Sequence, residues 1–155
     1  MSYKIQNSIR LLAIILILTI TGCEEPQNYS FTEVSPAQVK QLLDKDGVIL
    51  LDVREPEEYV YCHIPGSILL SVKNIPERYR ELPKDKEIIV YCKSGCGRSP
   101  KVCEMLAQVG FTQVKNMTGG IDAWCESKGR VEGSFQTKEG IGKVPKCELG
   151  RGCES

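Results

Sequence analysis

Apolar residues in the middle of the chain fall into short runs that predict strands. Residues 48–51 and 87–91 are mostly apolar and rich in β-branched side chains, as is typical of parallel strands covered on both faces. Weaker runs predict further strands at residues 31–34, 68–70 and 114–117. The pattern therefore indicates a sheet whose central strands are buried.

Segments with helical spacing separate these runs. Ser35-Pro36 and Ser99-Pro100 each combine a favoured N-cap residue with proline at the first helical position. Further helices are predicted at residues 56–61, at residues 75–82 and directly after Gly119-Gly120. Strands that alternate with helices predict an open α/β sheet, whose functional sites lie at the carboxyl ends of the strands. Asp52 and Cys92 both follow such strands.

The beginning of the chain has the pattern of an export signal. A positively charged start precedes an apolar run at residues 11–20, which is shorter than the roughly 20 residues of a membrane span. The sequence Ile20-Thr21-Gly22-Cys23 resembles a bacterial lipobox, in which cleavage precedes the cysteine and that cysteine is lipidated. We therefore expect a lipoprotein signal peptide at 1–22, a linker at 23–30 and a lipid anchor on Cys23. The alternative is an uncleaved N-terminal anchor.

If the protein is such a lipoprotein, we expect it in the cell envelope, on the periplasmic or extracytoplasmic side of a bacterial membrane. The remaining chain predicts one domain at residues 31–130, followed by a glycine-rich, flexible tail at residues 131–155. The formal net charge is +0, from 20 basic and 20 acidic residues, and no basic block stands out. We therefore expect no binding to nucleic acid. We also expect a monomer.

Eight cysteines are many for 155 residues, and an exported protein lives where disulfides persist. Setting Cys23 aside leaves seven, an odd number, so at least one thiol stays unpaired and Cys92 is the natural candidate. Cys147 and Cys153 in the tail are expected to be a disulfide or idle thiols, because no histidine accompanies them. Two further cysteines, Cys103 and Cys125, are predicted to be packed small hydrophobes. The role of Cys62 and the disulfide pairing stay open.

The stretch YCKSGCGRS, residues 91–99, places Cys92 in a tight loop between a predicted strand and a predicted helix. Backbone N–H groups and the positive end of a helix both favour a thiolate and bound anions. The amides of residues 93–98 can form an anion-binding nest, to which the side chains of Lys93 and Arg98 add donors. The sequence therefore predicts a nucleophilic sulfur at an anion site.

Four segments of this chain, in order and with the right spacing, resemble the successive signatures of a single rhodanese domain. They are LLDVREPEEY at 50–59, HIPGSI at 63–68, YCKSG at 91–95 and GGIDAW at 119–124. The resemblance implies an open five-stranded parallel sheet with helices on both faces. It implies catalysis by Cys92 within a substrate-binding loop made of Lys93, Ser94, Gly95, Cys96, Gly97 and Arg98. The implied reaction moves a sulfane sulfur from a small thiosulfate-like anion to a thiol or cyanide through a Cys92 persulfide, without metal or cofactor.

The loop departs from the usual rhodanese pattern. Five residues separate Cys92 from Arg98, where rhodanese loops commonly have four. The longer loop resembles those of cell-cycle phosphatases and arsenate reductases of the same fold, and a wider loop suits a tetrahedral oxyanion such as phosphate or arsenate. Phosphatase or arsenate reductase activity is therefore an alternative. A non-enzymatic sulfur- or partner-binding module is a further alternative, which the intact Cys92 and Arg98 argue against.

Three other positions near the loop have open roles. Cys96 is a possible resolving thiol that closes a disulfide with Cys92, as in a thiol oxidoreductase or a redox-gated transferase, or it is only a small loop residue. Asp52 and Arg54 either orient the active-site loop or form a structural ion pair. His63 is expected to fix its turn by hydrogen bonds rather than to take part in catalysis.

Overall fold

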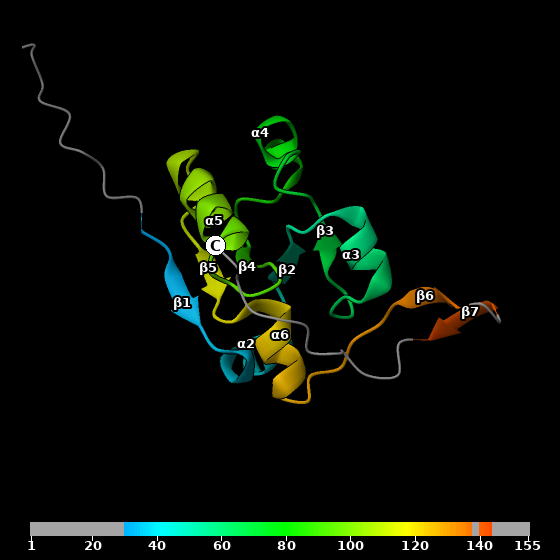
Figure 1. Cartoon of the computed structure of the whole chain (residues 1–155). Helices are drawn as coiled ribbons and strands as arrows, with labels where there is room; N and C mark the ends of the chain where they lie inside the picture. The colour runs from blue at the N-terminus through cyan, green and yellow to red at the C-terminus, as the bar shows by residue number, and fades with distance from the viewer. Residues whose placement is uncertain (1–29, 138–139, 144–155) are drawn as a thin grey trace, which may run out of the picture.

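All five apolar runs become strands of one parallel sheet (Figure 1). The computed structural model describes residues 30–137 and 140–143. The strands are β1 (Thr32–Val34), β2 (Val48–Asp52), β3 (Ile68–Leu69), β4 (Glu87–Tyr91) and β5 (Val114–Met117). Their order is β1-β5-β4-β2-β3, and every neighbouring pair is parallel. The predicted five-stranded α/β fold is therefore confirmed.

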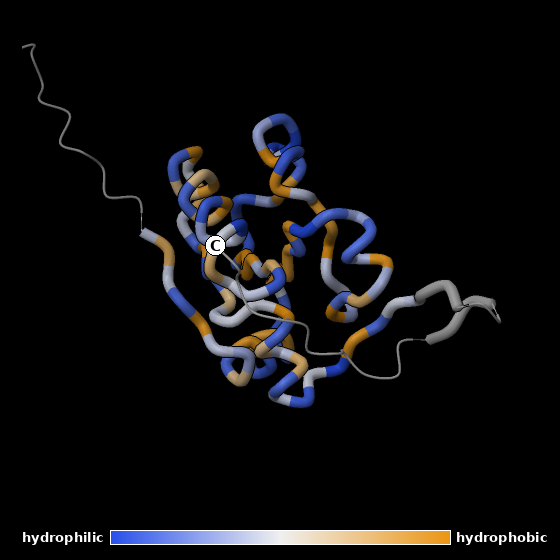
Figure 2. Tube along the Cα trace, viewed as in Figure 1, coloured by the Kyte–Doolittle hydropathy of each residue, from blue (hydrophilic) through white to orange (hydrophobic). Residues whose placement is uncertain are grey.

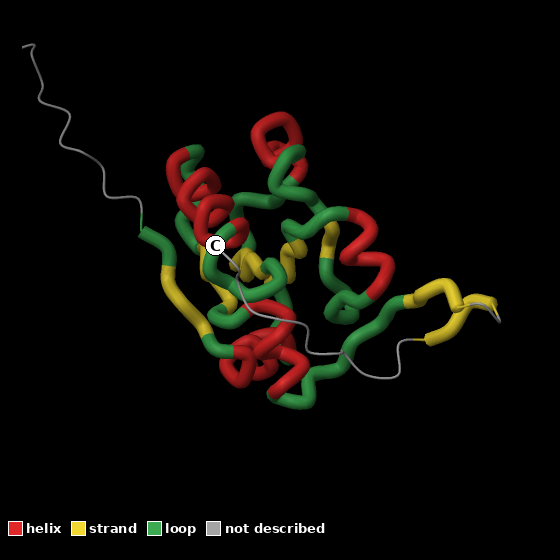
Figure 3. Tube along the Cα trace, in the orientation of Figure 1, coloured by secondary structure: helices red, strands yellow, loops and turns green. Residues whose placement is uncertain are grey.

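Helices fill the connections between the strands, as Figure 3 shows. They are α2 (Pro36–Leu43), α3 (Pro56–Tyr61), α4 (Ile75–Arg78), the 3-10 turn η1 (Tyr79–Glu81), α5 (Arg98–Gln108) and α6 (Gly120–Glu126). Among the described residues, no helix has the length and apolar character that crossing a membrane requires.

Two apolar clusters lie on opposite faces of the sheet. Successive residues of β4 point to opposite faces, so Ile88 and Val90 pack with α4 and α5, whereas Ile89 and Tyr91 pack with α2 and α6. Cys92 continues this alternation and lies on the α5 face. Figure 2 shows the hydrophobic stretches gathered around the central strands. The central strands β2 and β4 are thus covered on both sides, as their continuous apolar runs predict.

The two Ser-Pro helix starts behave differently. At α2, the Ser35 hydroxyl accepts from the Gln38 N–H at 3.3 Å, and the Gln38 side chain accepts from the Ser35 N–H at 2.8 Å, which makes a capping box. At α5, Gly97 is the N-cap and Ser99 already lies inside the helix. The prediction that Ser99 caps this helix was wrong, because its hydroxyl bonds to a sulfur instead.

The segment after residue 130 contains structure that the sequence analysis did not predict. Strands β6 (Ser134–Thr137) and β7 (Gly140–Lys143) form an antiparallel pair. Before them, the backbone of Glu132 exchanges hydrogen bonds of 2.7 and 2.8 Å with that of His63. The His63 ring stacks on Tyr59, with centroids 3.9 Å apart, and its Nδ1 lies 2.8 Å from the Tyr59 carbonyl, so His63 makes the turn-fixing contacts expected of it. Cys23, Cys147 and Cys153 lie outside the described residues.

Candidate functional site

Cys92 stands directly after β4, and the loop of residues 93–97 carries the chain from it into α5. The loop turns sharply at Gly95, which has a φ of +69°. A Cβ atom at this position would lie 2.6 Å from the nitrogen of Gly119 and 2.6 Å from the carbonyl of Met117. Only glycine allows this conformation together with this close approach.

The N-terminus of α6 holds the carbonyl groups of the loop. The N–H groups of Ile121 and Asp122 donate to the carbonyls of Cys92 and Lys93, both at 3.0 Å. A side chain at Gly120 would collide with the same two carbonyls, which explains why the second glycine of the GGIDAW segment has to be small. With these carbonyls bound to α6, N–H groups later in the loop are available to the sulfur.

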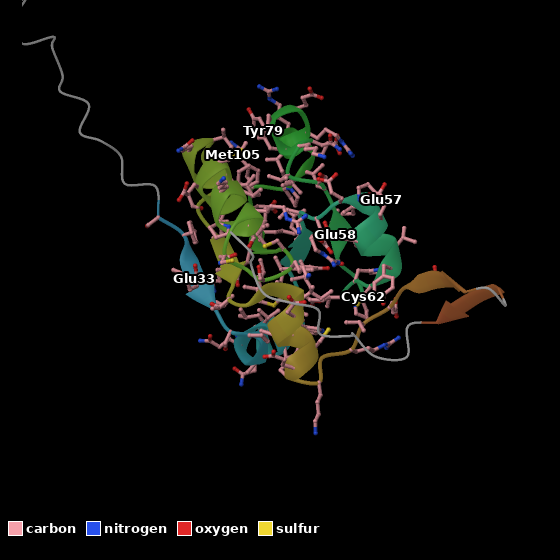
Figure 4. All side chains as sticks on the ribbon, in the orientation of Figure 1. Glu33, Glu57, Glu58, Cys62, Tyr79 and Met105 are labelled. Atoms are coloured by element: carbon pink, nitrogen blue, oxygen red, sulfur yellow. The ribbon has the colours of Figure 1, made fainter. Side chains whose placement is uncertain are left out.

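A second anchor comes from β5, and the sequence analysis missed it. The side-chain amide of Asn116 donates to the Gly95 carbonyl at 3.0 Å and to the Glu33 carboxylate at 2.9 Å. Asn116 is 1 % exposed, and Figure 4 labels Glu33 on β1. The loop is thus tied to two strands that lie far from it in sequence, and no local pattern could have indicated this.

The sulfur of Cys92 is surrounded by hydrogen-bond donors. Burial alone raises the pKa of this thiol, but hydrogen bonds from the Ser99 hydroxyl and from the backbone of Ser99, Gly95 and Gly97 outweigh it and hold the pKa below its usual value. The Ser99 hydroxyl lies 3.3 Å from the sulfur. These donors form a cradle around the sulfur. The N–H groups of Gly95 and Gly97 belong to the predicted nest of residues 93–98, whereas the sequence analysis did not assign Ser99 to it. Such an arrangement stabilises a thiolate.

Replacing Ser99 by Ala is expected to shift the pH dependence of the Cys92 thiolate. The hydroxyl favours the charged form, so its loss raises the pKa of Cys92, and reactivity then requires a higher pH. A hydrogen bond to a charged group is worth about 1.5 kcal/mol or more, which corresponds to about one pH unit. The rate of Cys92 alkylation by iodoacetamide, measured against pH, reports this shift. An unchanged midpoint in Ser99→Ala would show that the hydroxyl does not bond to the thiolate.

The predicted loop residues divide into two groups. Gly95 is buried within the loop and Ser94 is half-buried, whereas Lys93, Cys96 and Gly97 are exposed at its rim. Arg98 is the first residue of α5, and its guanidinium forms an ion pair with Glu58 of α3. The site thus brings together the buried Cys92 thiol and a partly exposed rim that carries Lys93 and the Arg98–Glu58 ion pair. Among the described residues, no group of three His, Cys, Asp or Glu side chains is arranged to hold a metal ion.

The structure does not join Cys96 to Cys92. Cys92 is not disulfide-bonded, nor are the buried Cys62 and Cys103, whereas Cys96 and Cys125 are disulfide-bonded. The structure therefore argues against Cys96 as the resolving partner of Cys92, because Cys96 is disulfide-bonded and Cys92 is not. The prediction that Cys103 and Cys125 are packed small hydrophobes is confirmed, because Cys103 lies in one apolar cluster and Cys125 packs against the other. The sulfur of Cys125 is in addition disulfide-bonded, which the sequence left open.

A Cys96→Ser variant tests this reassignment. Because Cys96 is in a disulfide that does not include Cys92, it cannot trap an oxidised Cys92. We expect dilute hydrogen peroxide to convert Cys92 to the same products in wild type, purified without reductant, and in Cys96→Ser, as mass analysis of the Cys92 peptide measures. A Cys92–Cys96 disulfide in wild type, replaced by a sulfenic or sulfinic acid on Cys92 in Cys96→Ser, would restore the resolving-thiol hypothesis.

Asp52 and Arg54 form a structural ion pair. Their side chains are 0 % and 5 % exposed, and Arg54 Nη2 lies 2.6 Å from Asp52 Oδ2. The same nitrogen donates to the carbonyl of Cys62 at 2.6 Å, at the C-terminal end of α3. Of the two roles that the sequence left open, the contacts support the structural one. The pair holds α3 against the end of β2.

Comparisons with protein families, with individual proteins and with solved structures all indicate the same family. The model of the family described as rhodanese-like domain matches residues 35–127. A sulfurtransferase of Allochromatium vinosum is 41 % identical over 85 residues, which cover 55 % of this chain and 78 % of that protein. A thiosulfate sulfurtransferase GlpE of Pseudoalteromonas translucida is 40 % identical over 95 residues, covering 61 % and 90 % of the two chains. Among solved structures, a rhodanese-related protein of Thermoplasma volcanium has a TM-score of 0.61 at 30 % identity, covering 65 % of this chain and 97 % of that one.

Proposed function

The chain belongs to the rhodanese-like domain family, and we propose that it is a sulfurtransferase that carries a sulfane sulfur on Cys92. The observation that carries this proposal is the cradle of donors around the Cys92 sulfur, which keeps its pKa low although the residue is only 2 % exposed. A buried sulfur with a stabilised negative charge is a nucleophile and also a good leaving group. Sulfur transfer needs both properties in one atom.

The proposed reaction has two displacement steps and needs no cofactor. The Cys92 thiolate attacks the outer sulfur of a thiosulfate-like dianion; a sulfur–sulfur bond to Cys92 forms, the bond to the sulfonate breaks, and sulfite leaves with the electron pair. A thiol or cyanide then attacks the outer sulfur of the persulfide, and Cys92 leaves as a thiolate. The loop N–H groups, Arg98 and Lys93 offset the negative charge of the donor.

An assay with thiosulfate and cyanide tests this proposal. We expect the purified protein to form thiocyanate with ping-pong kinetics, because the two substrates react in separate steps. Absence of thiocyanate formation, with Cys92 shown to be reduced, would contradict the proposal for this donor and acceptor.

The spacing of the loop favours a second candidate function. Five residues lie between Cys92 and Arg98, and a loop of this length suits a tetrahedral oxyanion bound by N–H groups and a guanidinium. In that case, Cys92 attacks phosphorus or arsenic rather than sulfur. Hydrolysis of an aryl phosphate without thiocyanate formation would favour this function over sulfur transfer.

We also propose that the protein is a lipoprotein exported to the bacterial cell envelope. The support is the sequence alone: a short apolar run followed by Ile20-Thr21-Gly22-Cys23. In a bacterial host, Cys23→Ser should remain as an unprocessed precursor or leave the membrane fraction, because the variant lacks the thiol that is lipidated. Immunoblotting of fractionated cells measures both. Normal processing and unchanged fractionation would contradict the proposed anchor.

A further inference from the structure

A carboxylate from outside the loop holds the arginine of the loop. Glu58 on α3 accepts hydrogen bonds from Arg98 Nη1 at 2.5 Å and from Arg98 Nη2 at 2.9 Å, although 40 residues separate the two in sequence. The side chains are 31 % and 32 % exposed, so the pair lies at the rim of the site rather than in the core. Both bonds come from the two terminal nitrogens, Nη1 and Nη2, so Glu58 does not use the edge of the guanidinium that carries the Nε–H group. That edge can donate to a second oxyanion.

Glu58 is itself fixed in place. Its Oε2 also accepts from the N–H of Glu55 at 3.0 Å, closing a capping box at the start of α3. The other end of α3 is held by the bond from Arg54 to the carbonyl of Cys62. Burial raises the pKa of Glu58, but the bonds from Arg98 and from the Glu55 backbone outweigh it and lower the pKa. Glu58 therefore stays ionised while Cys92 is a thiolate.

These contacts give α3 a function in the site. A long arginine side chain at a partly exposed rim loses rotamer entropy when it binds an anion, and an existing ion pair removes part of that cost before binding. We propose that Glu58 is a positioning residue, which fixes Arg98 so that its free edge receives the oxyanion group of the donor. This rests on the proposed function and narrows it to donors whose sulfane sulfur is attached to an oxyanion group, as in thiosulfate.

The neighbouring residue provides a matched control. Glu57 is one position away on the same helix, carries the same charge and is exposed. In Figure 4, Glu58 lies on the side of α3 that faces the sheet, and Glu57 lies on the outer side. Glu57→Gln thus removes the same charge from α3 without touching Arg98. Any effect that is specific to Glu58→Gln then comes from its contact rather than from the net charge.

The test measures anion binding separately from sulfur transfer. Sulfate should protect Cys92 from iodoacetamide, and mass analysis of the Cys92 peptide gives the sulfate concentration that halves the alkylation rate. We expect this concentration to rise about tenfold in Glu58→Gln and to stay unchanged in Glu57→Gln, as is expected when roughly one charge-assisted contact is lost. The KM for thiosulfate should rise similarly, with kcat changed less than threefold. In an Arg98→Ala background, Glu58→Gln should have no further effect, because Glu58 acts through Arg98.

Several results would overturn the inference. The inference fails if sulfate does not protect Cys92 in wild type, or if Glu58→Gln binds sulfate as tightly as wild type or more tightly. It also fails if Glu58→Gln weakens sulfate binding equally in wild type and in the Arg98→Ala background. A general loss of stability is recognised separately, since thermal unfolding of each variant is measured alongside. If wild type shows the expected sulfate protection but forms no thiocyanate, the proposed function fails while the role of Glu58 stands.

Discussion

Cys92→Ser is expected to reduce thiocyanate formation to the rate of the uncatalysed reaction. The variant keeps the donors from Ser99, Gly95 and Gly97, so the cradle itself remains. A serine hydroxyl, however, has a far higher pKa than a thiol and cannot form a persulfide. The loss should therefore persist under reducing and oxidising conditions alike. Stability should change little, because oxygen replaces sulfur at a position that is only 2 % exposed and already has hydrogen-bond donors.

Two other thiols serve as controls for this prediction. Cys62 and Cys103 are buried and not disulfide-bonded, like Cys92, but burial raises the pKa of both. Neither should therefore act as a nucleophile at neutral pH. Cys62→Ser and Cys103→Ser should retain sulfur transfer once any loss of folded protein is taken into account. If sulfur transfer survives in Cys92→Ser and disappears in Cys62→Ser, the assignment of the nucleophile to Cys92 is wrong.

Arg54→Met is expected to lower the free energy of unfolding by about 3–5 kcal/mol. Methionine retains much of the apolar stem but leaves the carboxylate of Asp52, which is 0 % exposed, without its charged partner. It also removes the donor to the Cys62 carbonyl, so the C-terminal end of α3 loses its attachment. Urea unfolding followed by circular dichroism measures the change.

A double variant separates the two causes. Asp52→Asn combined with Arg54→Met removes both charges, so it should recover part of the stability that Arg54→Met loses. The remaining deficit then reports the lost contact with α3. If the free energy of unfolding of Arg54→Met lies within about 1 kcal/mol of the wild-type value, the pair does not hold α3. A change of that size is ordinary for a surface residue.

The parts of this fold that the sequence predicts depend on short-range patterns. Residues 87–91 form a strand because they are apolar and β-branched, and the glycines and helix start that follow require a tight loop, so the position of Cys92 could be deduced. The parallel direction of the central strands was also indicated by their continuous apolar runs, whereas the order of the strands in the sheet was not predicted. The cradle was also predicted in outline, because N–H groups gather wherever a strand leads into a helix through such a loop.

The contacts that the sequence did not predict join residues far apart along the chain. Glu58 and Arg98 are 40 residues apart, and Asn116 reaches the Gly95 carbonyl from another strand. Ser99 was misassigned for a different reason. Ser-Pro is a good N-cap pattern, but α5 begins at Arg98, two residues before the predicted start at Pro100. Ser99 therefore lies inside the helix, and its hydroxyl donates to the sulfur instead. Sequence alone also could not tell which cysteines are paired, because disulfides depend on distances in the folded chain.

The central claim is that the Cys92 side chain carries the transferred sulfur. Mass spectrometry of the protein after thiosulfate treatment tests this claim most directly. The reduced protein should gain the mass of one sulfur atom, the peptide that contains Cys92 should carry it, and cyanide should remove it with release of thiocyanate. Cys92→Ser should gain nothing under the same conditions. A wild-type protein that gains no sulfur, or gains it on another cysteine, would contradict the account.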